Sequence, residues 1–327
     1  MLQTRIAAKL ILGSLLVLPA FAQIDNCQHR TVTVSVTAPD GSPVPQLGSA
    51  NFAGIYRKTS VHVTSAIMNR EPIRVVLLLD VSGSMKGMGT GFVGKFSLDL
   101  AEHFVSNMAP ETAIGLGYFY TELIPVLPPT TDRNSLLHQL EGLRTHPDSF
   151  KGRTAVWDAV LGSMKMFDHP RSGDVIYVIT DGGDNASKMT VNHVVQILGE
   201  SGIRLTAFVF QAMPAIRRTA EEEIGPPTVD EVARDTGGTI LTQMTESVGS
   251  LKVSGEPTLF EKSGKFTPFG SYLISQYRQI GSFYRIGFDL SESLKKPQNW
   301  KLELLGLEKS QREKIALTYP HVLPACH

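Results

Sequence analysis

Three near-continuous apolar runs, at residues 73–80, 174–180 and 203–210, constrain the fold of this chain more than any other feature. Such runs are typical of strands in a parallel sheet, because helices cover both faces of that sheet and leave neither face polar. Segments of helical period separate the three runs. Strands that alternate with helices in this way predict an α/β fold with a doubly wound, mostly parallel sheet.

The other elements of this sheet are predicted from the same periodicities. Helices are expected at 94–108, 133–144, 154–168, 190–200 and 228–236, and further strands at 113–120 and 239–242. Residues 122–130 contain three prolines, which cannot donate to a strand ladder. That segment therefore fits an antiparallel edge strand or a loop.

Shorter patterns flank the predicted sheet on both sides. Residues 32–36 alternate apolar and polar side chains before a Pro-Asp-Gly turn, which predicts a small β unit that is too short to hold a large core alone. Beyond residue 266, a helix at 269–280 and three strands are expected, with Tyr272 and Tyr277 among aromatic residues that suit a core better than an interface.

These patterns divide the chain into four predicted parts. They are a signal peptide (1–22), an N-terminal β segment (23–70), the α/β domain (71–245) and a C-terminal helix and β-strand extension (246–327). Arg5 and Lys9 precede a short apolar run, and small residues end it at Ala22, so we expect cleavage before Gln23. The mature protein is then secreted or periplasmic.

Charge and cysteine content narrow the possible partners. The 327 residues include 31 basic and 31 acidic side chains, and this balance gives no support for nucleic acid or an anionic membrane as the main partner. No later segment has the length of a membrane span. In an exported protein Cys27 and Cys326 could form a disulfide that ties the two ends together; the alternative is two unpaired thiols.

Polar side chains follow two of the buried strands. Asp80, Ser82 and Ser84 end the stretch VVLLLDVSGSM, Asp181 follows the strand at 174–180, and Thr154 lies where a loop enters a helix. Open parallel sheets bind ligands at the carboxyl ends of their strands, so we expect these side chains to gather there. Two carboxylates and three hydroxyls are hard oxygen ligands that suit Mg²⁺. None of the five residues is a histidine or a cysteine, which argues against zinc.

The segments DVSGS, GRTA and TDGGD together resemble the metal-ion-dependent adhesion site of von Willebrand factor type A (VWFA) domains, over about residues 70–245. The resemblance implies a Rossmann-like fold and a Mg²⁺, Mn²⁺ or Ca²⁺ ion. The implied ligands, direct or through water, are Asp80, Ser82, Ser84, Thr154 and Asp181. In that family the carboxylate of a partner protein often completes the coordination, which implies metal-dependent adhesion or protein binding and no enzymatic activity.

The flanking segments resemble bacterial exported VWFA-related proteins of the acidobacterial type. The similarity lies in VTVSVTAPDGSPVPQL before the domain and in DEVARDTGGTIL and the closing strands after it. The segment SANFAGIYR departs from that pattern, because it lacks the acidic residue that precedes the phenylalanine in the family.

The residues also allow functions other than adhesion. One alternative is a structural or assembly component in which the metal serves only to stiffen the loops. A Mg²⁺-dependent hydrolase would need a general base, and His193 fits a surface histidine better. The glycines of 89–94 form a G-x-G-x-x-G pattern, but they do not follow their strand directly, as a dinucleotide site requires. Asp158 and Asp184 could orient metal ligands or simply cap helices.

Overall fold

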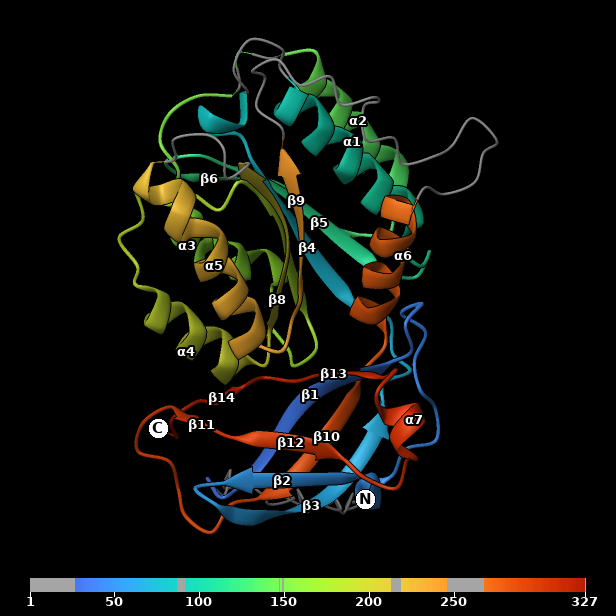
Figure 1. The fold of residues 1–327 in the computed structure, drawn as a ribbon. Coiled ribbons are helices and arrows are strands. Elements are labelled where there is room, and N and C mark those ends of the chain that lie inside the picture. The colour runs from blue at the N-terminus through green and yellow to red at the C-terminus, as the bar shows by residue number, and fades with distance from the viewer. Residues whose placement is uncertain are drawn as a thin grey trace, which may run out of the picture.

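The fold contains two six-stranded sheets, one above the other in Figure 1. The structure is a computed structural model that describes residues 27–326 except 87–91, 147, 149, 213–218 and 246–267. The central sheet has the strand order β6-β5-β4-β7-β8-β9. Its strands are β4 (Arg74–Asp80), β5 (Ala113–Phe119), β6 (Leu123–Thr130), β7 (Val175–Thr180), β8 (Arg204–Ala212) and β9 (Ile240–Thr245).

The central sheet is mixed. Five of its strands run parallel, and β6 pairs antiparallel with β5 at the edge. The proline-rich segment is therefore an edge strand, where missing backbone donors are tolerated. The predicted α/β class, with a mostly parallel sheet and accompanying helices, is confirmed.

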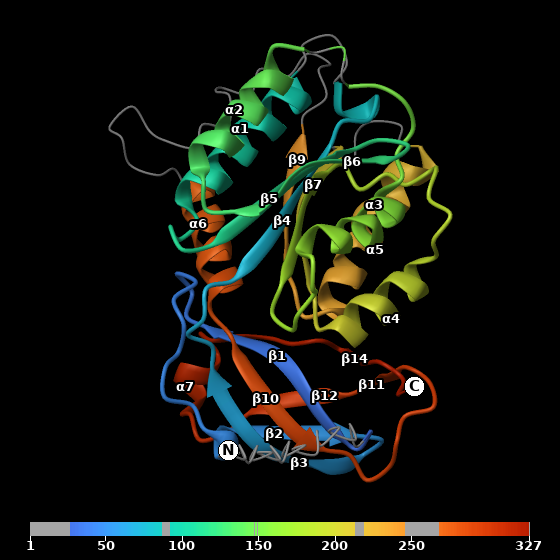
Figure 2. The same ribbon diagram turned by 180° about the vertical axis from the view of Figure 1, so that it is seen from behind.

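Helices lie on both sides of the central sheet (Figures 1 and 2). One side has α1 (Phe92–Asn107), α2 (Arg133–Arg144) and α6 (Pro268–Gly281). The other has α3 (Val156–Ser163), α4 (Val191–Ser201) and α5 (Ala220–Asp235). Strand β4 contributes to the buried core on both faces of the sheet. Leu77 and Leu79 belong to one buried cluster, and Val76 and Leu78 belong to the other.

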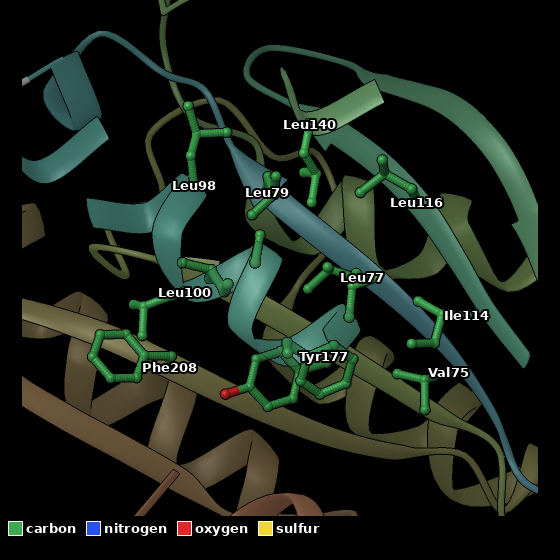
Figure 3. Packing of buried hydrophobic residues seen from close by; sticks show 14 of the residues in the cluster. Val75, Leu77, Leu79, Leu98, Leu100, Ile114, Leu116, Leu140, Tyr177 and Phe208 are labelled. Carbon is green, nitrogen blue, oxygen red and sulfur yellow. The ribbon is translucent and has the colours of Figure 1, made fainter. Parts of the chain in front are cut away.

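The core on the α1 side is aromatic as well as aliphatic (Figure 3). Tyr177 of β7 stacks on Phe104 of α1 with 4.4 Å between ring centroids, and Tyr277 of α6 meets Phe104 edge-on. The expectation that Tyr277 belongs to a core is confirmed, whereas Tyr272 on the same helix is 65% exposed. Helix α6 is thus packed against the central sheet by one face.

Two helices differ from their predicted bounds by more than two residues. The segment 154–168 is not one helix, since α3 ends at Ser163 and a 3₁₀ turn continues from Met164 to Phe167. Helix α5 begins at Ala220, eight residues before the predicted start, and contains Pro226 and Pro227. Those prolines, which interrupt helical hydrogen bonding, are the reason for the later predicted start.

The second, flanking sheet joins the two ends of the chain. Its order is β12-β2-β3-β10-β1-β13, built from β1 (His29–Thr37), β2 (Phe52–Tyr56), β3 (Thr59–Met68), β10 (Tyr284–Asp289), β12 (Lys301–Leu304) and β13 (Ala316–Thr318). Strand β10 lies between β3 and β1, antiparallel to both. The N-terminal β segment and the C-terminal extension, predicted as separate units, therefore share one sheet and one apolar core.

Smaller elements complete the flanking region. They are the 3₁₀ turn η1 (Ser49–Asn51), the short helix α7 (Lys309–Arg312) and the antiparallel pair β11 (Gln298–Asn299) and β14 (Val322–Leu323). A second 3₁₀ turn, η2 (Ser84–Lys86), follows β4 in the central region and contacts α1. Among the described residues no helix has the length and apolarity needed to cross a membrane.

One partly buried and one buried arginine lie where the two sheets meet. Arg74, at the start of β4, donates to both carboxylate oxygens of Asp174 at 3.0 and 2.6 Å. Arg204, at the start of β8, is 3% exposed, donates to the carbonyl of Ile280 at 2.8 Å and lies over the ring of Phe283. These charges are held at the amino ends of the central strands, on the side of the flanking sheet.

Cys27 and Cys326 form a disulfide across 299 residues of sequence, with 5.7 Å between their Cα atoms. Replacing both by serine is expected to lower the free energy of unfolding by about 2–4 kcal/mol, because the cross-link restricts the unfolded chain. Denaturant unfolding of the oxidised wild type and the double variant measures this difference. An unchanged midpoint would show that the bond contributes nothing to stability.

Candidate metal centre

Asp80 is the last residue of β4, and its carboxylate is held inside the carboxyl edge of the central sheet. The side chain is 1% exposed. Its Oδ1 accepts the backbone N–H of Ser82 at 2.9 Å, and its Oδ2 accepts the hydroxyl of Thr180 at 2.6 Å. Thr180 ends the neighbouring strand β7, and the sequence analysis did not single it out.

The two serines lie together beyond Asp80. Their Oγ atoms are 3.1 Å apart, so both hydroxyls can approach one point, as the alternate spacing suggested. Ser82 is fully buried whereas Ser84, in η2, is exposed. One hydroxyl of the pair therefore lies inside the protein and the other lies at its surface.

Thr154 and Asp181 approach the same edge from two other loops. Thr154 is buried, its N–H donates to the side chain of Asn185 at 3.0 Å, and its carbonyl accepts the N–H groups of Asn185 and Ala186. Asp181 follows β7 and accepts the N–H of Gly183 at 3.0 Å. The loop after β7 thus joins Thr154 to Asp181.

Asp158 and Asp184 hold backbone in place. Asp158 accepts the N–H groups of Lys188 and Met189 at 3.0 and 2.9 Å. Asp184 accepts the N–H of Val156 in the first turn of α3 at 3.2 Å. Because the N-cap residue Ala155 offers no side-chain acceptor, the loop after β7 caps α3 instead.

Further residues of this edge escaped the sequence analysis. The hydroxyl of Ser187 accepts the N–H groups of Trp157 and Asp158, and Asn185 binds Thr154. The run of polar residues after Asp181 is the sequence feature from which their role could have been predicted. A loop this rich in side-chain acceptors fits a role in fastening a neighbouring helix.

The electrostatics of Asp80 favour a bound cation. Burial, reinforced by the negative charge of Asp181, raises the pKa of Asp80 from 3.8 to about 7, although hydrogen bonds from Ser82 and Thr180 oppose the shift. A divalent cation would offset the charge of both carboxylates. Carboxylate and hydroxyl oxygens are ligands that such a cation accepts, so the residues present fit the group.

The described residues contain no cluster of three or more histidines, cysteines or carboxylates that could hold a metal. A cation at this edge would therefore depend on the hydroxyl groups as well as on Asp80 and Asp181. With so few charged ligands, coordination positions remain for water or for an outside oxygen. Gly89 and Gly91 of the glycine pattern at 89–94 lie outside the described residues, and Gly94 belongs to α1.

His193 belongs to a different part of the molecule. It lines a cleft of about 900 Å³ between α4, α5 and the β11–β14 pair, together with Arg234, Trp300 and His321. None of the five candidate ligands lines that cleft.

Comparison with known proteins identifies the central region. Residues 75–183 match the family described as the von Willebrand factor type A domain. The chain contains a VWFA domain. The matched residues run from β4 to the loop after β7, so four of the sheet's strands and all five candidate ligands lie inside the match.

Solved structures resemble this VWFA-containing chain at low identity. An aerotolerance-related membrane protein from Bacteroides fragilis, with multiple mutations to serines, is 21% identical over 52% of this chain and 91% of that one, with a TM-score of 0.42. The conserved hypothetical protein BatB from Bacteroides thetaiotaomicron is 20% identical over 63% and 96%, with a TM-score of 0.43. No curated protein matches the chain.

A third structure is proximal thread matrix protein 1 from the mussel byssus, with a zinc-occupied MIDAS motif. It is 11% identical over 67% of this chain, with a TM-score of 0.43. The chain matches about half (49%) of the length of the mussel protein.

Proposed function

We propose that this protein is an exported binding protein that holds a divalent cation at the carboxyl edge of its VWFA domain and uses it to bind a partner protein. The ligands would be Asp80, Ser82, Ser84, Thr154 and Asp181. The observation that carries the proposal is the buried carboxylate of Asp80, which faces the charge of Asp181 and is surrounded by hydroxyl groups.

The chemistry expected of the site is binding. Mg²⁺ is the expected ion, with Mn²⁺ or Ca²⁺ as substitutes, and when bound it would offer a coordination position to a partner's carboxylate. Asp80 and Ser82 would hold the ion from inside, while the exposed Ser84 lies on the side from which a partner arrives. Export is supported by the disulfide, which persists in oxidising compartments. The predicted signal peptide lies outside the described residues.

A purely stiffening role for the metal has less support. The loops of this edge are already joined by backbone hydrogen bonds, from Lys151 to Val81 at 2.8 Å and from Gly83 to Gly152 at 3.1 Å. A hydrolase would require a general base, and His193 lines another cleft. Protein binding therefore remains the function that the geometry supports best.

Calorimetry on the mature protein tests the proposal. Mn²⁺ and Mg²⁺ are expected to bind to the wild type and to Asp230→Ala, which removes a half-exposed carboxylate of α5, but not to Asp80→Ala. Proteins that the metal-loaded wild type captures from the surroundings of its source cell should be released by a chelator. Metal binding that survives in Asp80→Ala would refute the site, and capture that ignores the chelator would refute its role in binding.

A further inference from the structure

The turn Lys151–Gly152–Arg153 is fastened to the candidate metal centre through its backbone. The N–H of Lys151 donates to the carbonyl of Val81 at 2.8 Å, and the carbonyl of Gly152 accepts the N–H of Gly83 at 3.1 Å. Gly152 has φ +80°, and a Cβ there would press on the ring of Tyr120. Arg153 directly precedes the candidate ligand Thr154.

Both basic side chains of this turn extend into solvent. Lys151 and Arg153 are exposed, and neither forms a salt bridge within the part of the chain that the structure describes. Nearby, Lys86 pairs with Asp148 at 3.7 Å, and Glu122 accepts the hydroxyl of Tyr120. Two positive charges therefore stand beside the centre on a backbone that hydrogen bonds hold in place.

Acidic residues lie on another side of the same edge. Glu221 and Glu223 are exposed in the first turns of α5. That helix contacts the loop of Asp181, because a Cβ on Gly225 would overlap the carbonyl oxygen of Gly182. Among the described residues, the β4–β5 side of the centre thus carries Lys151 and Arg153 with the single carboxylate of Glu122 nearby, and the side toward β8 carries Glu221 and Glu223.

We propose that the partner is an acidic peptide segment that crosses this edge in one direction. One carboxylate would bind the cation, and further acidic side chains would lie over Lys151 and Arg153, away from Glu221 and Glu223. In an extended peptide, side chains on one face are about 7 Å apart, so acidic residues at alternate positions would each have one of the two basic side chains to pair with. This inference rests on the proposed function and adds the chemistry and direction of the partner.

Two synthetic peptides test the proposal with the Mn²⁺-loaded full chain. One carries an aspartate followed by glutamates at two alternate positions, and the other has serine in place of both glutamates. Fluorescence anisotropy is expected to show about fivefold tighter binding of the acidic peptide, in keeping with two exposed ion pairs. High salt should remove the difference, since it screens exposed charges.

Charge variants locate the effect. Lys151→Gln/Arg153→Gln should abolish the preference for the acidic peptide while Mn²⁺ binding is kept. Lys165→Gln/Lys314→Gln, exposed residues elsewhere, changes the net charge equally and should retain the preference. Equal, metal-dependent binding of both peptides would overturn the inference and leave the proposed function standing. Binding of neither peptide would overturn the inference alone, whereas peptide binding unaffected by Asp80→Ala would overturn both. Stronger competition by a sulfated oligosaccharide than by the acidic peptide would also overturn the inference.

Discussion

Asp80→Asn is expected to make the metal-free protein more stable and to abolish metal binding. The carboxylate of Asp80 is buried beside the charge of Asp181, and no cation offsets it in the metal-free protein, so an amide of the same shape removes an unfavourable charge. Metal-free Asp80→Asn should melt on the order of 5 °C above the metal-free wild type at pH 8. Excess Mn²⁺ should raise the melting temperature of the wild type only.

The stability of the metal-free protein should depend on pH, because burial raises the pKa of Asp80. The pKa of Asp80 is about 7 in the folded protein, against 3.8 ordinarily, so between these values the folded state binds more protons than the unfolded state. The stability of the metal-free wild type should therefore fall as pH rises from about 4 to about 7, and this contribution should be absent in Asp80→Asn. Asp230→Asn, which changes a half-exposed carboxylate of α5, is the control. Equal melting temperatures of wild type and Asp80→Asn at pH 8 would contradict a buried, uncompensated charge.

Asp174→Ala is expected to have the opposite effect on stability, lowering the free energy of unfolding by about 3–5 kcal/mol. Asp174 is 1% exposed, receives two hydrogen bonds from the guanidinium of Arg74 and accepts the N–H of Arg171 at 2.9 Å. Its removal would leave the positive charge of Arg74 partly buried without its anion. Denaturant titration measures the loss, and Mn²⁺ affinity of the folded variant should not change.

A double-mutant cycle separates the ion pair from local packing. If Arg74 and Asp174 stabilise the fold through each other, the double variant Arg74→Met/Asp174→Ala should lose less stability than the sum of the two single variants. Strict additivity would show that the pair makes no contribution of its own. Mn²⁺ affinity is expected to be independent of Asp174, because Asp174 lies at the amino ends of the central strands and the candidate metal centre lies at their carboxyl ends. A loss of Mn²⁺ affinity in folded Asp174→Ala would contradict this.

The two aspartates show how position along a strand decides what a buried carboxylate does. Asp174 precedes β7 at its amino end and faces arginines, whereas Asp80 ends β4 and faces hydroxyls and another acid. The first is neutralised by the protein itself. The second would be neutralised by the proposed cation, and the free energy spent on burying its charge in the metal-free protein is then expected to appear as metal affinity.

Much of the central sheet could be predicted because its signals are local. Residues 75–79 of β4 and 175–179 of β7 form unbroken apolar runs, which are typical of strands covered on both faces. Helix α2 has the predicted bounds 133–144, because Asp132 caps its first turn through the N–H of Ser135. Asp80 and Asp181 could be proposed as ligands of one site because strand ends in a parallel sheet share one edge.

Other features depend on contacts that no local pattern reveals. The pairing of Val32 with Ile286, and of Gly54 with Leu302, joins segments that lie far apart in the sequence. Alternation marks each strand but does not name its neighbour. Thr180 was missed for a related reason, since it reads as the last residue of a buried strand until the structure places its hydroxyl on Asp80.

The position of the VWFA domain between β3 and β10 determines how the protein would bear force. Both connections to the domain leave from β3 and β10, which are neighbouring antiparallel strands of the flanking sheet. They enter the domain on the side opposite the candidate metal centre (Figure 1). A pull on a metal-bound partner, resisted at the flanking sheet, would load β3 and β10 together along their length. Their ladders to β2 and β1 would then be sheared as a whole and would not open one hydrogen bond at a time. The disulfide at the base would limit how far the chain could extend if those ladders failed.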